Sequence, residues 1–114
     1  MKPVNHIKIR NGMTANELVS QMELSGVLGA GRLGKAASIC EAMVKDRDCK
    51  VFLGIAGPLV PGGMREIIID MIKNKWVDVV VTTGATLTHD LGEALGYRHY
   101  QGNANANDAE LLKK

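Results

Sequence analysis

Residues 51–81 read VFLGIAGPLVPGGMREIIIDMIKNKWVDVVV, and this stretch decides the fold class. It begins with a continuous apolar run at 51–56 and ends with a second, mainly apolar run at 76–81 that contains one charged residue, Asp78. Short apolar runs without polar alternation are typical of parallel strands that are covered on both faces. About twenty residues separate the runs, which is enough for the crossover that two parallel strands need. The stretch therefore predicts a right-handed βαβ unit.

The segment between the two runs predicts a loop followed by a helix. Its prolines and glycines exclude a regular helix from Gly57 to Gly63. An apolar face at helical spacing then follows, made of Met64, Ile67, Ile68, Met71 and Ile72. After the second run, a similar stripe predicts a further helix that closes at Gly96 and contains Leu87, Leu91, Ala94 and Leu95. The order of elements is βαβα.

The residues before this unit predict two helices and one short strand. Thr14-Ala15-Asn16-Glu17 has the form of a capping box, so we expect a helix from there to about Gly26. Apolar residues at helical spacing predict a second helix from Arg32 to about Lys45. His6–Arg10 alternates polar and apolar residues, which predicts a strand with one covered face.

Length and composition limit the classes of protein to which the chain can belong. With 114 residues, 46% of them apolar, we expect a single domain without an internal boundary. A net charge of +2, scattered basic residues and 4% aromatics disfavour nucleic acid as the main partner. No run is long and apolar enough to cross a bilayer, and no apolar signal segment begins the sequence. These features predict a cytoplasmic protein.

The two cysteines fit the same compartment. Cys40 and Cys49 have no metal-ligand spacing, so we predict no metal site. We expect Cys40 to be buried on the apolar stripe of its helix and Cys49 to lie near a surface turn.

Two strands are too few to complete the predicted sheet. Each reads as covered on both faces, yet each has only one neighbour in this sequence. The last residues, Asp108–Lys114, read as a helix cap and first turns without a developed apolar face. We therefore expect an incomplete α/β fold that takes further strands from a missing part or from a partner chain.

A glycine motif lies between the two predicted N-terminal helices. Residues 29–34, Gly-Ala-Gly-Arg-Leu-Gly, match the dinucleotide fingerprint G-x-G-x-x-G. That fingerprint works only where a strand precedes it, and here a helix precedes it. We interpret the glycines as a turn between helices. NAD binding by Gly29, Gly31 and Gly34 is an alternative.

Two loops are better placed to bind a ligand. Gly57–Gly63 follows a buried strand and precedes a helix, so its backbone N–H groups could face an anion. Thr82–Gly84 follows the second strand in the same layer. Ligands of open α/β sheets bind at the carboxyl ends of strands, so the loops should converge on one crevice. A plain strand-to-helix turn is the alternative.

Polar side chains lie beside this crevice. His89, in the first turn of the following helix and next to Asp90, can take or give a proton near neutral pH. A solvated or capping histidine is the alternative. Arg65 and Glu66 open the preceding helix, and we expect them to pair with neighbouring side chains. Contact with a phosphate is the alternative.

Residues 52–66 and 76–85 together resemble the deoxyhypusine synthase family. The resemblance includes Gly63-Met64-Arg65-Glu66 at a helix start, Val77–Thr83 at a strand end, and Asp90-Leu91 shortly after. It extends more loosely over nearly the whole chain, which corresponds to about the first third of a family member.

The resemblance implies a Rossmann-like, NAD-binding fold and a homotetramer with active sites between subunits. It implies NAD-dependent transfer of an aminobutyl group from spermidine, through an enzyme lysine, to a lysine of the hypusine-bearing translation initiation factor. One alternative is a homospermidine synthase-like transfer to a small amine. Another is a non-catalytic subunit that binds a nucleotide or a partner chain.

The resemblance also assigns the residues of the site. NAD contacts fall on Gly57, Pro58, Leu59, Val60 and Pro61 and on Thr83, Gly84 and Ala85. Polyamine contacts fall on Thr88 and His89, and His89 is the candidate catalytic residue. Many members carry two acidic residues there, and a hydroxyl or an imidazole attracts an ammonium less than a carboxylate does. The imine-forming lysine lies beyond the matched region, so we expect this chain alone to be inactive.

Overall fold

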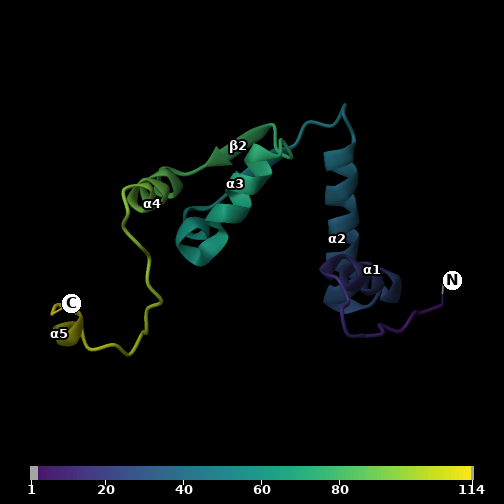
Figure 1. The fold of residues 1–114 in the computed structure, drawn as a ribbon, viewed down its shortest axis with the longest axis horizontal. Coiled ribbons are helices and arrows are strands. Elements are labelled where there is room, and N and C mark those ends of the chain that lie inside the picture. The colour runs from purple at the N-terminus through teal and green to yellow at the C-terminus, as the bar shows by residue number, and fades with distance from the viewer. Residues whose placement is uncertain (1–2, 114) are drawn as a thin grey trace. The chain divides into compact units, whose positions relative to one another are not determined.

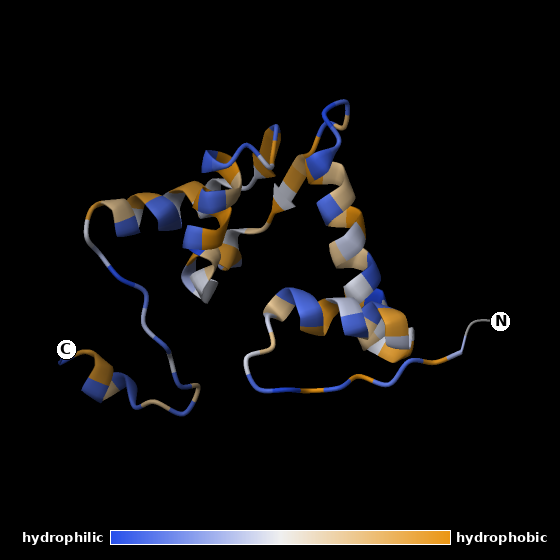
Figure 2. Ribbon diagram, turned by 45° about the vertical axis from the view of Figure 1, so that its right-hand side comes forward, coloured by the Kyte–Doolittle hydropathy of each residue, from blue (hydrophilic) through white to orange (hydrophobic). Residues whose placement is uncertain are grey.

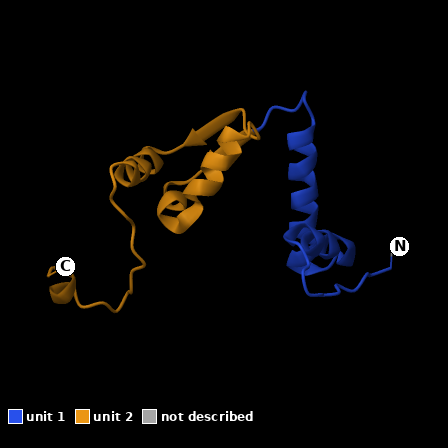
Figure 3. Ribbon diagram, viewed as in Figure 1, with its two compact units in different colours: residues 1–51 blue, residues 52–114 orange. Residues whose placement is uncertain are grey.

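The computed structural model describes residues 3–113, which form helices and one pair of strands (Figure 1). The elements are α1 (Ala15–Ser25), α2 (Leu28–Lys45), β1 (Phe52–Ile55), η1 (Gly57–Leu59), η2 (Val60–Met64), α3 (Arg65–Lys73), β2 (Val79–Thr82), α4 (Gly84–Ala94) and α5 (Asp108–Leu111). They divide into two compact units, residues 1–51 and residues 52–114 (Figure 3). Within residues 3–113 no helix combines the length and the apolar character needed to span a membrane.

The capping box starts α1 as the sequence predicts. Thr14 Oγ1 accepts a hydrogen bond from the Glu17 backbone N–H at 3.2 Å, and Glu17 Oε2 accepts one from the Thr14 backbone N–H at 2.8 Å. The helix ends at Gly26, whose φ of +67° is the left-handed conformation that glycine adopts without strain. The start and the end of this helix are confirmed.

The glycine motif lies inside α2, so the predicted turn at 29–34 is wrong. The helix begins at Leu28 instead of Arg32, and the chain turns at Gly26 and Val27. A Cβ at Gly34 would lie 2.7 Å from Glu23 Cα, and one at Gly31 would lie 2.6 Å from the Gly26 carbonyl carbon. The glycines therefore let α2 approach α1 closely. Because α1 precedes them instead of a strand, they lack the context of a dinucleotide fingerprint.

Two further expectations for the first unit are wrong. Residues His6–Arg10 form no strand, because the Lys8 N–H donates to Gln21 Oε1 of α1 at 2.7 Å instead of to a neighbouring strand. Cys40 is exposed, whereas Cys49 is half-buried after a turn. Gly34 and Ser38 lie on the side of α2 that packs on α1, and the helical period places Cys40 on the opposite side.

The second unit contains the predicted parallel strand pair. β1 and β2 run in register from Phe52 opposite Val79 to Ile55 opposite Thr82, and α3 connects them. β2 begins three residues later than predicted because Trp76 still belongs to the turn that closes α3, where its N–H donates to the Met71 carbonyl at 2.9 Å. Residues 3–113 thus form a mixed α/β structure with two parallel strands.

The predicted loop after β1 consists of irregular helical turns. The 3₁₀ turn η1 and the single π turn η2 replace it, and Gly63, at φ +87°, kinks the backbone inside η2 just before α3 begins. The prolines fit because each lies at the start of its turn, where a backbone N–H is not needed. After β2, α4 begins at Gly84 directly, which places His89 in its second turn instead of its first.

The described part of the second unit leaves much of its sheet uncovered. Ile55 and Val60 are its buried apolar residues, whereas Phe52 is 66% exposed and β2 is exposed along its length. Hydrophobic residues occur along both strands and recur along α3 (Figure 2). A larger Rossmann-like sheet with additional strands therefore stays a prediction.

Candidate functional site

The two predicted loops meet at the carboxyl ends of the strands. Gly57, directly after β1, is buried against the start of α4: a Cβ there would lie 2.7 Å from Ala85 Cβ and 3.4 Å from Thr83 Oγ1. The parallel register explains this contact, since Ile55 and Thr82 end side by side and both chains leave the sheet at the same edge. The structure thus brings Gly57, Thr83 and Ala85 together.

A threonine pair fixes this junction. Thr82 Oγ1 donates to the Ile55 carbonyl oxygen at 3.2 Å and shares a hydrogen bond of 2.6 Å with Thr86 Oγ1. Thr86 is only 6% exposed, so its hydroxyl is satisfied inside the unit. Sequence reasoning gave Thr86 no role. The sequence feature that indicates its role is the four-residue spacing from Thr82. This spacing brings the two hydroxyls to one side of the strand-to-helix turn.

The N-terminus of α4 is open toward the crevice. Thr83 is the extended N-cap residue, and its side chain makes no capping hydrogen bond. The first N–H groups of a helix have no partner within the helix, so those of Gly84 and Ala85 are available. A Cβ added at Gly84 would meet no atom within 4 Å. Free N–H groups, the positive end of the helix dipole and open space together fit an anionic group such as a phosphate.

The other residues assigned to NAD differ in exposure. Pro58 and Leu59 are exposed and Pro61 is half-buried, whereas Val60 is only 4% exposed. The Val60 side chain lines a small apolar cavity of about 170 Å³ between α3, the strands and α4. Val60 therefore packs in the core of this unit.

Thr88 and His89 follow on α4. The Thr88 hydroxyl donates to the Gly84 carbonyl oxygen at 3.1 Å, one turn back along the helix. His89 is four residues after Ala85, so these two residues lie on the same side of α4. The catalytic candidate is thus one helical turn away from the point where Gly57 meets α4.

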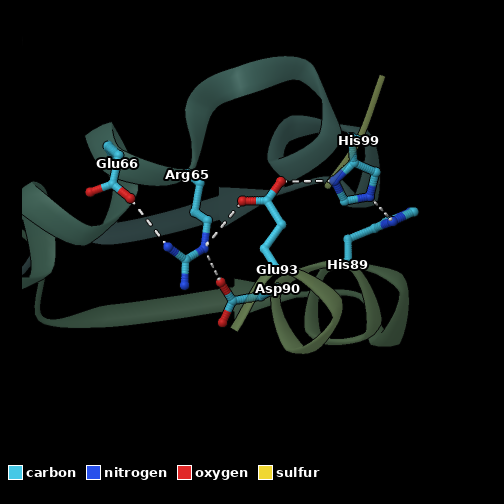
Figure 4. A network of polar contacts seen from close by, with 6 residues as sticks. All are labelled: Arg65, Glu66, His89, Asp90, Glu93 and His99. Carbon is cyan, nitrogen blue, oxygen red and sulfur yellow. Dashed lines mark hydrogen bonds and ion pairs between the residues drawn. The ribbon is translucent and has the colours of Figure 1, made fainter. Parts of the chain in front are cut away.

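Arg65 joins the start of α3 to α4 (Figure 4). Its Nε donates to Asp90 Oδ1 at 2.7 Å and lies 3.7 Å from Glu93 Oε2, and its Nη1 lies 3.1 Å from Glu66 Oε1. The hydrogen bond that Arg65 donates to Asp90 raises the pKa of Arg65, and the Coulombic attraction of the three carboxylates adds to it. The expected pairing of Arg65 and Glu66 with their neighbours is confirmed.

A second histidine completes this network. His99 Nδ1 lies 2.8 Å from Glu93 Oε1, and His99 Nε2 lies 3.0 Å from His89 Nδ1. Sequence reasoning gave no role to Glu93 or His99. One signal was the four-residue spacing of His89 and Glu93 on a helix. The other was Gly96, at φ +94°, which ends the helix region and lets the following residues turn back. Between Pro3 and Lys113, no group of His, Cys, Asp and Glu is arranged to hold a metal ion.

Comparison with known proteins identifies the family. The sequence profile described as deoxyhypusine synthase matches residues 17–114. The chain belongs to the deoxyhypusine synthase family. The matched region contains all of α2, both strands and the crevice.

Individual relatives agree with this assignment. A probable deoxyhypusine synthase of Methanothermobacter thermautotrophicus is 49% identical over 98 residues, which are 86% of this chain and 32% of that protein. One of Methanosarcina thermophila is 46% identical over 110 residues, which are 96% of this chain and 34% of that protein. A deoxyhypusine synthase-like protein of Chlorobaculum parvum is 39% identical over 113 residues, which are 96% of this chain and 31% of that protein. The chain spans about a third of the length of these relatives.

Proposed function

We propose that this chain supplies part of the NAD site of a deoxyhypusine synthase-like transferase. The enzyme would move an aminobutyl group from spermidine to a lysine of the hypusine-bearing translation initiation factor. The observation that carries the proposal is the junction of Gly57 with Thr83 and Ala85 at the open N-terminus of α4. This junction lies within the part of the chain that matches the family.

The crevice residues would hold NAD through its phosphates. The N–H groups of Gly84 and Ala85 would donate to phosphate oxygens, and the helix dipole would favour their negative charge. Because Gly57 has no side chain, the backbone after β1 can lie directly against the start of α4. Any side chain at this position would clash with the Ala85 methyl group. When bound, NAD supplies a temporary acceptor for the hydride of an amine.

The carrier lysine would come from elsewhere. Lys73 ends α3 and Lys75 lies in the turn before β2. Both lysines therefore lie near the N-terminal end of β2, whereas the crevice is at the carboxyl ends of the strands. Lys113 follows the short helix α5. We therefore propose that the 114-residue chain is inactive alone and works with a polypeptide that carries the rest of the family sequence, in a homotetramer or a mixed assembly.

A second candidate is transfer to a small amine, as in homospermidine synthases. It is favoured by the hydroxyl of Thr88 and the imidazole of His89, which stand where the family resemblance implies an acidic pair. The nearest carboxylates do not replace that pair, because Asp90 binds Arg65 and Glu93 binds His99. Product analysis with putrescine and with the initiation factor as competing acceptors separates the two candidates.

The proposal is tested with a chimera. In the Methanothermobacter thermautotrophicus relative, the matched 98 residues are replaced by the aligned residues of this chain. We expect the chimera to transfer label from radioactive spermidine to the acceptor protein only when NAD is present. An inactive chimera, assayed beside an active unaltered relative, would contradict the proposal provided that both proteins are folded.

A further inference from the structure

Glu93, His99 and His89 form a continuous hydrogen-bonded chain, which we call the histidine relay. Glu93 Oε1 and His99 Nδ1 are 2.8 Å apart, and His99 Nε2 and His89 Nδ1 are 3.0 Å apart. Both distances are those of good hydrogen bonds. The relay begins at the carboxylate on α4 and ends at the residue that lies one turn from the crevice (Figure 4).

The carboxylate decides which ring nitrogens carry hydrogen. An ionised Glu93 can only accept, so His99 Nδ1 must carry the hydrogen. A neutral His99 then has its lone pair at Nε2, which accepts from His89 Nδ1–H. His89 is left with a lone pair at Nε2, which none of the hydrogen bonds of the described residues engages.

The charges around the relay support this arrangement. Arg65 Nε, from the start of α3, lies 3.7 Å from Glu93 Oε2 and places a positive charge beside this carboxylate. Arg65 is itself held by Asp90 and Glu66. Arg98 lines the same polar pocket as His99 and Glu93 and adds a second positive charge. Glu93 is 27% exposed and His99 is 30% exposed, so water screens these interactions only in part.

We propose that His99 and Glu93 are positioning residues that keep His89 Nε2 unprotonated, ready to accept a proton from the ammonium of an amine substrate. An amine can lose hydride from the carbon next to its nitrogen only when that nitrogen has a free lone pair, so an ammonium must first lose a proton. The inference rests on the proposed function for the identity of this proton donor.

The proton transfer balances within the relay. The ammonium nitrogen gives one proton to His89 Nε2, and His89 Nδ1 gives its own proton to His99 Nε2. His99 becomes an imidazolium whose charge faces the Glu93 carboxylate, and His89 is neutral again. No electrons leave the substrate in this step, and no bond to carbon is made or broken.

The first test reads the tautomers directly. Long-range ¹H–¹⁵N correlation spectra of the 114-residue chain with ¹⁵N-labelled histidine, recorded above the usual histidine pKa of about 6.5, distinguish the two neutral forms. We expect the Nδ1–H form for His89 and His99. We expect mainly the Nε2–H form, which free histidine favours, for His6 in the first unit. An Nε2–H tautomer at His89 in the unaltered chain would overturn the proposal without any variant.

Matched variants then test the direction of the relay. H99F should return His89 to the tautomer ratio of His6, and E93L should do the same by removing the acceptor. E93Q keeps an oxygen that can accept and should restore the His89 Nδ1–H form. H6F is the control and should leave His89 unchanged. If His89 keeps its tautomer in a folded H99F chain, His99 is not a positioning residue.

An activity measurement separates this inference from the proposed function. In the chimera with spermidine and NAD, H99F should lower kcat about tenfold with little change in KM, because a base in the wrong tautomer affects proton transfer more than binding. E93Q should recover most of the loss. An active chimera whose kcat does not change in H99F would overturn the relay alone. A folded but inactive unaltered chimera would overturn the proposed function and, with it, the amine as proton donor.

Discussion

Arg65 Nε donates to Asp90 Oδ1 at 2.7 Å, and this single contact ties the first turn of α3 to the second turn of α4. The two residues are 25 positions apart in the sequence. Arg65 also lies close to Glu93, so the same guanidinium supports the carboxylate on which the histidine relay depends. The residues that join α3 to α4 are therefore continuous with the histidine relay.

Removal of this contact should loosen the second unit. R65A leaves Asp90 and Glu93 without their shared cation, so we expect a lower urea midpoint for the second unit and faster amide exchange in α4. The Arg65 side chain is 27% exposed and Asp90 is 47% exposed, so solvent screening keeps the effect modest. R47A removes the same charge from the first unit and should leave exchange in α4 unchanged. Equal effects of the two variants would argue against a role of Arg65 in joining the helices.

Gly57 should not tolerate a side chain. In G57A the new Cβ would lie 2.7 Å from Ala85 Cβ, and such overpacking typically costs about 1–3 kcal/mol of unfolding free energy. G62A is the control, because a Cβ there meets nothing within 4 Å. The double variant G57A/A85G should recover most of the loss in denaturant unfolding. Full stability of G57A alone would contradict the close contact.

A carboxylate at the start of α4 should separate helix stability from cofactor binding. T83D would cap the free N–H groups and stabilise the helix by about 1 kcal/mol. The same charge would repel a phosphate at this position, so we expect NAD to bind the chimera about tenfold more weakly. T14D adds an acidic cap to α1 and should not change NAD binding. If calorimetry gives the same NAD affinity for T83D and for the unaltered chimera, the phosphates do not bind at the N-terminus of α4.

The glycine motif of α2 should matter for packing and not for NAD. G34A would place its Cβ 2.7 Å from Glu23 Cα and should lower the thermal midpoint of the first unit. G29A meets nothing within 4 Å, and alanine's better helix propensity should make it neutral or stabilising by up to about 1 kcal/mol. Neither change, nor G31V in a folded chimera, should weaken NAD binding by itself. A selective loss of NAD binding in G31V would favour the alternative that this motif binds the dinucleotide.

The capping box gives the first unit a predictable pH dependence. The hydrogen bond from the Thr14 backbone N–H to Glu17 lowers the pKa of Glu17 below its usual 4.5. A carboxyl group whose pKa is lower in the folded state adds stability above its unfolded pKa, and that stability is lost as the pH falls through the folded pKa. E17Q should therefore reduce the stability of α1 at pH 7 and have a smaller effect at pH 3, measured by circular dichroism of the chain. If E17Q lowers the stability of α1 by the same amount at pH 7 and at pH 3, the contribution of the cap does not depend on the charge of Glu17.

The elements of this protein could be predicted where local signals agree. The capping box and Gly26 define α1 because each acts within one turn of the chain. The apolar runs predicted parallel strands because their length and lack of alternation hold for a strand wherever its neighbour lies. The meeting of the two loops followed from parallel register alone, and the structure places Gly57 against Ala85 accordingly.

Other features of the fold depend on residues that are close in space but distant in the sequence, and a local sequence pattern does not identify these residues. Alternation at His6–Arg10 predicted a strand, but α1 supplies the hydrogen-bond acceptor there, and no strand among the described residues pairs with this segment. Glycines at 29–34 predicted a turn, but they serve the close approach of two helices. Cys40 belongs to an apolar stripe that its own unit leaves exposed.

The sequence by itself therefore determined the helices, the parallel strand pair, the crevice loops and the family, since these depend on short-range periodicity, caps and turn residues. Only the tertiary structure decided that Arg65 reaches Asp90 and that His99 lies between Glu93 and His89. The physical reason is that such contacts depend on how helices cross and where a chain turns back after a glycine. Changes of a few ångströms in those positions make or break a hydrogen bond, and no pattern of residue types along one helix specifies them.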